Sequence, residues 1–568
     1  MAGFLYNTYR ALNGEVRRLK SQNLTLQQVI DSLVSSGEFS WWDESFSDVV
    51  GIIYESLNGV SHLILQNKYS SHSLYSQQSL IWLTDDSDFS SDSDFSSLTC
   101  PSSNNTVLTI PTNLQASSLG INPFEGIRIS GTTQAELGRS IAAGDVNGDG
   151  LNDIIIGAPE DGDGKVYVIY GSLTPSATID VTTLSSSGQG IIIQGPDLGI
   201  KFGFAVAVGD INGDGIDDIA IAGKREKVSI VFGAVNLPTS IGFSDIGSTV
   251  GGSIVNIKTL NIAMFDLNGD NFADLVMPSE GNDGIISFED DNVYILLGSN
   301  ALGASINLGG AETIIRLSGV GNIGGASGAH SASNILDINN DGFQDLFLNE
   351  DGGDKAYVLF GRETFPNNID MTQIGSPGNT DGILIAGPPV DLDNNSGGFG
   401  LPGKYSGDFN NDGNIDIVIG KHQNANRGTV WIIYGPFSSS NNNIDISDIG
   451  TNPTKGALIE GISNDVSIGR TTILADVNND NIADLVTGAF PTIDQSGDSG
   501  EVYIVLGHTS PSATIDLSDA TKVVKITGEF VFFGLSLDVA DISCDGTLNL
   551  IVGSPGLIGD EACYVFFN

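Results

Sequence analysis

Basic residues are scarce in this sequence. The 568 residues hold 23 Lys and Arg against 69 Asp and Glu, which gives a formal net charge of −46. A nucleic-acid partner would require a basic surface, so this balance argues against one. Three cysteines are too few for a disulfide scaffold. No run of 18 apolar residues is present, so the sequence predicts no transmembrane segment.

Signatures of catalysis and export are also missing. The five histidines are scattered without metal-ligand spacing, and the chain has neither a Gly-x-Ser-x-Gly elbow nor a phosphate-binding loop. We therefore expect no enzyme, although an active site assembled from distant loops stays open because fold does not determine function. The N-terminus is polar and lacks the apolar core of a signal peptide.

A nine-residue motif, Asp-x-Asn-x-Asp-Gly-x-x-Asp, dominates the remaining sequence. Its copies start at Asp145, Asp210, Asp266, Asp337, Asp408 and Asp476, and a weaker copy starts at Asp541. Such long, recurring units are typical of a repeat architecture.

The motif has the donor pattern of a calcium loop. Side-chain oxygens stand at positions 1, 3, 5 and 9, and position 7 would add a backbone carbonyl, which suits an ion that takes about 6–8 oxygens. Glycine or asparagine at position 6 permits a left-handed turn. An acidic turn without metal is the alternative for one copy, but repelling carboxylates in six near-identical copies favour bound Ca²⁺. Mg²⁺ fits less well, because it demands strict octahedral geometry.

The sequence predicts six bound Ca²⁺ and leaves a seventh open, because the last loop holds only two carboxylates. The predicted metal ligands, with position 7 acting through its backbone, are Asp145, Asn147, Asp149, Leu151, Asp153, Asp210, Asn212, Asp214, Ile216, Asp218, Asp266, Asn268, Asp270, Phe272, Asp274, Asp337, Asn339, Asp341, Phe343, Asp345, Asp408, Asn410, Asp412, Asn414, Asp416, Asp476, Asn478, Asp480, Ile482, Asp484, Asp541, Ser543, Asp545 and Asn549.

Short apolar runs surround each loop and predict four strands per unit. In the first unit, small residues 140–144 precede the loop, and apolar runs at 154–156 and 166–170 follow it. Seven such units predict an all-β fold, a seven-bladed β-propeller with the small-residue strand innermost. A stacked solenoid would show shorter and stricter periods. Because the last unit ends after its third strand, we expect Ile127–Ser130 to complete blade seven.

Two further signatures support a family resemblance. Phe202-Gly203, Phe399-Gly400 and Phe533-Gly534 precede the loops of their units, and Gly157-Ala158-Pro159 follows the first loop. With these motifs, residues 121–568 resemble the FG-GAP repeats of integrin alpha-subunits. The resemblance implies a seven-bladed propeller with calcium in loops on one face.

The first 120 residues differ from the repeats. Leucines spaced seven apart within residues 1–35 predict a helical coiled coil, and hence a homo-oligomer through residues 5–33, with dimer and trimer both open. An amphipathic helix packed on its own domain is the alternative. Residues 36–120 are interpreted as a small accessory element and a Ser/Asp-rich linker.

These features together favour a calcium-stabilised recognition or adhesion domain that binds a protein or glycan partner as an oligomer. We expect it to be extracellular or surface-displayed, because low-affinity calcium modules belong outside cells. A virion or phage-type attachment fibre and a lectin are the alternatives, and a hydrolase is a third hypothesis.

Overall fold

The computed structural model describes residues 49–57, 60–67, 80–82, 113–116 and 126–567, with gaps at 174, 197–198, 225–226, 260, 280–291, 307–313, 320–331, 350–354, 388–398, 403–405, 423–426, 463–465, 492–498 and 557–560. The chain divides into two compact units, Met1–Asp94 and Phe95–Asn568. The first unit contains an antiparallel sheet of β1 (Val49–Leu57), β2 (Val60–Asn67) and β3 (Leu80–Trp82). The coiled coil expected within residues 1–35 lies outside the described residues.

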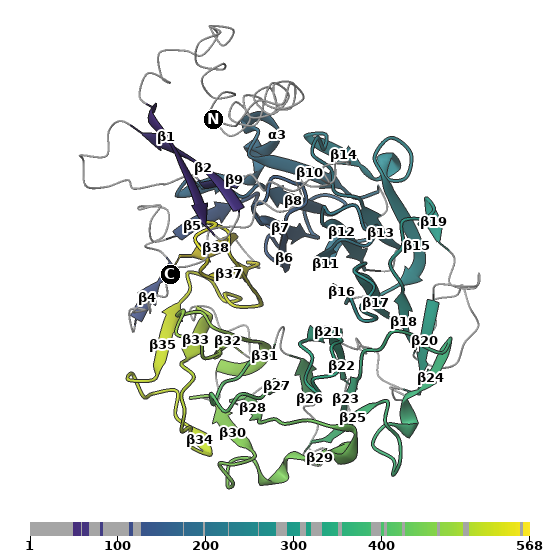
Figure 1. Ribbon diagram of the computed structural model, residues 1–568, viewed down its shortest axis with the longest axis vertical. Coiled ribbons are helices and arrows are strands. Elements are labelled where there is room, and N and C mark those ends of the chain that lie inside the picture. The colour runs from purple at the N-terminus through teal and green to yellow at the C-terminus, as the bar shows by residue number, and fades with distance from the viewer. Residues whose placement is uncertain are drawn as a thin grey trace, which may run out of the picture. The chain divides into compact units, whose positions relative to one another are not determined.

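The described part of the second unit forms seven five-stranded sheets arranged around a common axis (Figure 1). This is the all-β, seven-bladed β-propeller that the repeats predicted. From the inner to the outer edge, blade one contains β6 (Ser140–Gly144), β7 (Asp153–Ala158), β8 (Lys165–Ile169), β10 (Gly190–Gln194) and β14 (Ser240–Gly242). Blade two contains β11 (Phe202–Gly209), β12 (Asp218–Gly223), β13 (Lys227–Val231), β15 (Gly252–Lys258) and β19 (Ser305–Ile306).

The next three blades repeat this order. Blade three contains β16 (Ala263–Phe265), β17 (Asp274–Pro278), β18 (Val293–Leu296), β20 (Ile314–Ser318) and β24 (Asn368–Asp370). Blade four contains β21 (Ala332–Ile335), β22 (Asp345–Asn349), β23 (Lys355–Leu359), β25 (Gly382–Ala386) and β29 (Asn443–Asp445). Blade five contains β26 (Phe399–Pro402), β27 (Ile417–Lys421), β28 (Thr429–Ile433), β30 (Gly456–Glu460) and β34 (Thr514–Ile515).

The last two blades include strands from the beginning of the propeller. Blade six contains β31 (Val466–Ala475), β32 (Asp484–Pro491), β33 (Glu501–Val505), β35 (Val523–Thr527) and β4 (Asn113–Gln115). Blade seven contains β36 (Ser536–Ala540), β37 (Asn549–Ser554), β38 (Ala562–Phe566), β5 (Gly126–Ser130) and β9 (Thr178–Asp180). The pairing of β5 with β38 confirms the predicted closure, with Gly126 opposite Phe566 and Ser130 opposite Ala562. β4 lies before the boundary expected at residue 121.

The fifth strand of each blade corrects the expected count of four. The first four strands of a blade are antiparallel, whereas the fifth pairs in parallel and comes from the following unit. In blade one, β10 pairs with β14, which the chain forms between the third and fourth strands of blade two. Each unit contributes a short strand to the preceding blade. This strand pairs with the fourth strand of that blade and covers its otherwise unpaired edge.

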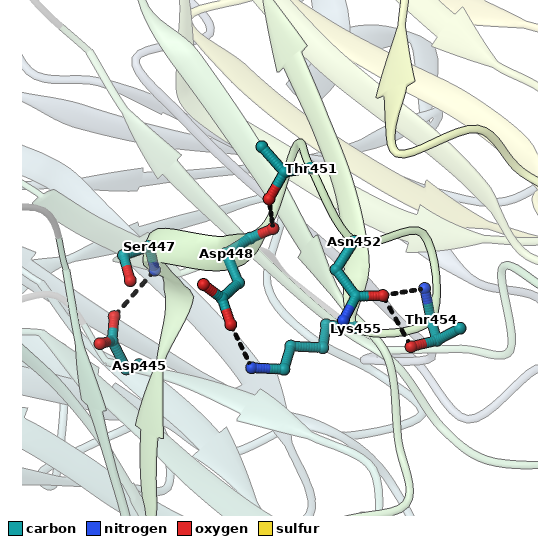
Figure 2. A network of polar contacts seen from close by, with 7 residues as sticks. All are labelled: Asp445, Ser447, Asp448, Thr451, Asn452, Thr454 and Lys455. Carbon is teal, nitrogen blue, oxygen red and sulfur yellow. Dashed lines mark hydrogen bonds and ion pairs between the residues drawn. The ribbon is translucent and has the colours of Figure 1, made fainter.

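The fifth strands account for a repeated Ile-Asp pair in the sequence. It occurs at Ile179-Asp180, Ile369-Asp370, Ile444-Asp445 and Ile515-Asp516. In each copy the aspartate accepts a backbone N–H two residues on, as Asp445 does from Ser447 at 2.8 Å (Figure 2). That hydrogen bond lowers the pKa of Asp445 and caps the turn that ends the strand.

Short helical turns occupy the connections between blades. They are η3 (Val181–Thr183), α3 (Leu184–Ser187), η4 (Phe243–Asp245), η5 (Met371–Gln373), η6 (Ser439–Asn441) and η7 (Ile446–Asp448). η7 lies in the network of Figure 2, where Lys455 forms an ion pair of 2.6 Å with Asp448. Among the described residues, no helix is long and apolar enough to cross a membrane.

Within the described segments, the hydrophobic core consists of seven clusters, each shared by two adjacent blades. Strand β7 shows how the sequence produces this arrangement. Ile154 and Ile156 belong to the cluster shared with blade seven, and Ile155 to the cluster shared with blade two. Side chains alternate between the faces of a strand, so a strand buried on both faces requires a continuous apolar run.

Candidate calcium loops and the contacts between blades

All seven predicted calcium loops connect the innermost strand of a blade to its second strand. The second strand begins at position 9 of the motif in six blades, as β7 does at Asp153, and one residue later in blade five. The structure therefore places the predicted ligands of each loop at one end of its blade. Every predicted ligand lies in a described segment.

Two positions of each loop adopt the left-handed backbone conformation. Position 6 has φ between 65° and 96° at Gly150, Gly215, Asn271, Gly342, Gly413, Asn481 and Gly546. Position 4 has φ between 54° and 75° at Gly148, Gly213, Gly269, Asn340, Asn411, Asn479 and Cys544. Sequence reasoning found position 6 and missed position 4. The signal was present, because six of those seven residues are Gly or Asn, the types that best tolerate positive φ.

The first aspartate organises the turn. In loop one, Asp145 Oδ1 accepts the N–H of Asp149 at 3.1 Å and Oδ2 accepts that of Gly150 at 2.8 Å. The equivalent pair of hydrogen bonds recurs in the other six loops. At position 5, Asp149 Oδ1 accepts the N–H of Leu151 at 2.9 Å. The backbone path is thus set by the carboxylates themselves.

The ninth residue is the most buried member of the motif. Asp153, Asp218, Asp274, Asp345, Asp416 and Asp484 have no exposed surface. Each accepts one N–H from position 2 and one from the glycine after the third strand, such as Val146 at 3.1 Å and Gly171 at 2.8 Å for Asp153. Together these bonds attach the loop to the sheet.

Burial makes this carboxylate unfavourable when the loop lacks a cation. Desolvation is the largest cause, and the charges at positions 5 and 1 add to it. The pKa of Asp218 rises to about 8, and those of Asp274, Asp345 and Asp416 rise to about 7. The charges at positions 1 and 5 raise the pKa of the ninth residue, and a divalent cation bound in the loop would reverse the sign of that interaction.

The donor set fits a hard cation in its chemistry. Carboxylates at positions 1, 5 and 9 and an amide at position 3 supply oxygens only. Among the described residues, however, no three acidic, His or Cys side chains converge into a preformed metal cluster. The reason is visible in the hydrogen bonds, because the carboxylate oxygens point at backbone N–H groups. The amide of Asn268 likewise donates to Asp270 at 2.9 Å.

Loop seven departs from the others at two ligand positions. Ser543 replaces Asn, and its hydroxyl donates to Asn549, which replaces the buried Asp. Asn549 Oδ1 accepts the N–H of Ile542 at 2.9 Å, but its buried Nδ2 has no partner. This loop keeps the backbone path and lacks the third carboxylate.

Adjacent loops are hydrogen-bonded to each other. The N–H of Asp217 in loop two donates to Asp145 O at 3.0 Å, and that of Ala273 in loop three donates to Asp210 O at 2.8 Å. Between blades seven and one, the side chain of Asn152 donates to Asp541 O at 3.1 Å. These hydrogen bonds therefore link the backbone of a loop to that of its neighbour.

Glycines interlock the blades at the opposite end of the inner strands. A Cβ on Gly157 would lie 2.0 Å from the carbonyl oxygen of Gly203 in the next blade. The same contact recurs between Gly420 and Gly469, Gly488 and Gly534, and Gly553 and Gly138, with spacings of 1.9, 2.1 and 2.2 Å. No side chain fits at such a site. The glycines of the Phe-Gly and Gly-Ala-Pro signatures therefore allow one blade to pack directly against the next.

Hydroxyl groups reinforce three of these contacts. Ser140 donates to Gly203 O at 2.9 Å, Thr471 to Gly534 O at 2.7 Å, and Ser536 to Gly138 O at 2.6 Å. The last bond crosses the closure between blades seven and one. Cys563 is a free, buried thiol, so it does not pair with Cys544 of the same unit.

The fold and its repeated loops define a seven-bladed propeller with interlocking glycines. A model of the FG-GAP repeat matches residues 137–169 and 202–231, which lie in blades one and two. Integrin alpha-7 of Rattus norvegicus is 34% identical over 107 residues, or 18% of this chain and 9% of that one. Integrin alpha-6 of Gallus gallus is 34% identical over 113 residues, or 20% and 10%. The chain therefore contains FG-GAP repeats, and its propeller resembles that of integrin alpha-subunits.

Two other similarities are more limited. Phosphatidylinositol-glycan-specific phospholipase D of Mus musculus is 29% identical over 163 residues, or 26% of this chain and 18% of that one. A solved structure, the Dos1 propeller, has a TM-score of 0.34 and 12% identity over 73% of this chain and 76% of that one. The chain spans between 9% and 18% of the length of these integrin and phospholipase relatives.

Proposed function

We propose that this protein is a calcium-stabilised recognition or adhesion domain that acts outside the cell as an oligomer and binds a protein partner. The proposal of calcium binding is supported by one observation, the same backbone path in the loops of all seven blades. Each loop has two left-handed positions, and its first aspartate accepts hydrogen bonds from equivalent backbone N–H groups. Seven blades that differ elsewhere keep this arrangement. Cation binding is a common requirement that accounts for it.

In each loop the ligands would be the side chains at positions 1, 3, 5 and 9 and the backbone carbonyl at position 7. The ion would supply two positive charges to a site where buried acids otherwise repel one another. The chain's own contribution is orientation, because the two left-handed residues turn the backbone and the ninth residue ties the loop to the sheet. Loop seven, with Asn549 in place of that acid, would bind more weakly.

The role proposed for calcium is structural. An ion that binds only the folded state stabilises it by mass action, by about 2.7 kcal/mol per site at a free concentration 100 times Kd. Elemental analysis combined with native mass spectrometry would count the ions, with six or seven calcium ions per chain as the expected result. A chain that stays metal-free in millimolar calcium would contradict the proposal.

A protein partner is favoured by the resemblance of the propeller to integrin alpha-subunits, which implies adhesion or recognition. The acidic surface argues against nucleic acid. Oligomeric display rests on the heptad pattern of residues 5–33 and would raise avidity without new contacts. Native mass before and after removal of residues 1–35 tests it, and an unchanged mass per particle would contradict it.

We propose a binding role without catalysis. His422 and His508, which follow β27 and β33, lie in different blades, and the phospholipase similarity covers only 18% of that protein. Hydrolysis of a phosphatidylinositol-glycan by the purified chain would overturn this part. Saturable binding on a glycan array would favour the lectin alternative.

A further inference from the structure

The proposed calcium loops of blades one to four pack directly on one another. The side chain at position 7 of one loop lies over position 4 of the preceding loop and leaves no room there for a Cβ. The pairs are Ile216 over Gly148, Phe272 over Gly213 and Phe343 over Gly269, where an added Cβ would lie 2.9, 2.2 and 2.8 Å from the side chain. Position 4 is therefore glycine in the first three loops because the next loop occupies the space of its side chain.

Position 7 is also the residue whose backbone carbonyl is a predicted calcium ligand. In loop three, the N–H of Phe272 donates to Asp270 of its own loop at 2.9 Å. The next N–H, that of Ala273, donates to the carbonyl of Asp210 in loop two at 2.8 Å. The backbone that carries this ligand is thus held from two sides, by its own loop and by the preceding one.

The end of the third strand adds a second connection. Gly233 donates its N–H to Asp218, the position 9 ligand of loop two, at 2.8 Å. The following residue, Ala234, donates to the carbonyl of Val146 at position 2 of loop one, at 3.1 Å. The same bond to the preceding loop runs from Ser299 to Ile211 at 2.9 Å, from Arg362 to Leu267 at 3.3 Å, and from His508 to Phe409 at 3.1 Å. Two ligand positions of a loop are therefore attached to its neighbour.

This connection is interrupted between loops four and five. The residue after the third-strand glycine of blade five is Pro436, which has no backbone N–H to donate. Position 7 is Asn414, and its side-chain amide donates to Asp412 of its own loop at 2.7 Å. The N–H of Leu336 donates to the hydroxyl of Ser406 at 2.8 Å, but both residues lie outside the motif. Within the described segments, these two loops share none of the backbone hydrogen bonds that join loops two and three.

We propose that loops one to four bind calcium cooperatively and that loop five binds independently of loop four. An ion that orders one loop fixes the surface on which position 7 of the next loop rests, so the next ligand set pays less conformational entropy. Ile216, Phe272 and Phe343 are then positioning residues. Coupling between two sites is reciprocal, so a filled loop three strengthens loop two by the same factor. The inference rests on the proposed calcium binding and adds its regulation, a steep response to calcium in one part of the ring.

Hydrogen exchange of the full chain, followed by mass spectrometry across a calcium series, tests the proposal. It gives each loop its own midpoint, the free calcium concentration at which the loop is half protected. Asp210→Asn removes a carboxylate from loop two and keeps the backbone carbonyl that Ala273 uses. We expect it to raise the midpoint of loop three by about 5-fold to 150-fold, the usual range of coupling between two sites. Asp337→Asn is the matched control in loop four, and it should leave the midpoint of loop five unchanged.

A second variant tests the contact itself. Phe272→Ala removes the ring from loop two and keeps every predicted ligand of loop three, because position 7 acts through its carbonyl. The effect of Asp210→Asn on the midpoint of loop three should be smaller in the Phe272→Ala background than in the wild type. An undiminished effect would overturn the positioning role of the ring.

The remaining outcomes separate this inference from the function on which it rests. An unchanged midpoint of loop three in Asp210→Asn would overturn the coupling, and a shift of loop five in Asp337→Asn would overturn the interruption. Loops that calcium protects with independent midpoints would sink only this inference. Loops that calcium does not protect at all in the wild type would sink the proposed calcium binding itself.

Discussion

Replacement of the buried ninth aspartate by asparagine should have different consequences with and without calcium. Asp218 has no exposed surface and accepts N–H groups from Ile211 at 3.0 Å and Gly233 at 2.8 Å. Its pKa rises from 3.8 to about 8, first through desolvation and then through Asp214 and Asp210. The folded, metal-free loop therefore holds a proton that the unfolded chain releases.

The sign and size of the metal-free effect follow from linkage. A raised folded-state pKa means that metal-free stability falls as pH rises from about 4 to about 8. At pH 7, roughly three pH units above 3.8, the penalty is about 4 kcal/mol at 1.36 kcal/mol per unit. Asp218→Asn removes this penalty but turns an amide N–H₂ toward N–H donors, which costs about 1–3 kcal/mol. We expect the variant in EGTA to be as stable as the wild type or more stable by about 1–3 kcal/mol.

With calcium present the wild type should gain stability and the variant should not. At 100 times Kd a filled loop contributes about 2.7 kcal/mol, and Asp218→Asn should lose about that calcium-dependent gain. Urea unfolding at pH 7, in EGTA and across a calcium series, measures both states. Asn549→Asp in loop seven is the reciprocal variant and should gain stability only when calcium is added. A loss by Asp218→Asn that is equal in EGTA and in calcium would refute the reasoning.

Three further outcomes are expected. Gly488→Ala should destabilise the propeller by about 1–3 kcal/mol, because its Cβ would meet Gly534 O at 2.1 Å, whereas Gly303→Ala, with nothing nearer than 3.9 Å, should melt like the wild type. A chain starting at residue 131 lacks β5 with its buried Ile127 and Ile129, so it should lose about 3–6 kcal/mol relative to one starting at 117, since both lack β4; equal calorimetric melting would contradict the closure. The melting temperature in EGTA should fall between pH 4 and pH 8, and it should fall less in saturating calcium. Parallel profiles in the two conditions would count against the loop acids as the cause of the fall.

The sequence was most informative where one residue type must satisfy a local requirement. The isoleucines of residues 154–156 predicted a strand buried on both faces, and the alternating oxygens predicted the loop between strands. Position 4 was not predicted because its residue type varies. It is Gly in some loops, as at Gly148, Asn in others, as at Asn340, and Cys544 in the last loop, although its backbone conformation is the same in all of them. The loops share a positive φ at this position, and no single residue type indicates it.

Non-local pairing could not be predicted in the same way. The fifth strands contain two or three residues, as in β19 and β14, and their partners lie in another repeat, so no local pattern marks them. Phe202-Gly203 and Gly157-Ala158 were visible as signatures, but only the fold brings Gly203 against Gly157.

The contacts between loops imply that the proposed calcium sites would act as a connected set. Asp145 contributes a predicted ligand and also accepts, through its carbonyl, an N–H from loop two. An ion that orders one loop therefore restricts the next one, which pays less conformational entropy when it binds its own ion. Loop seven has the poorest donor set and lies beside the closure, where Asn152 reaches Asp541 through a side chain. We therefore expect the conformation of loop seven to depend more than that of any other loop on ions bound in the neighbouring loops.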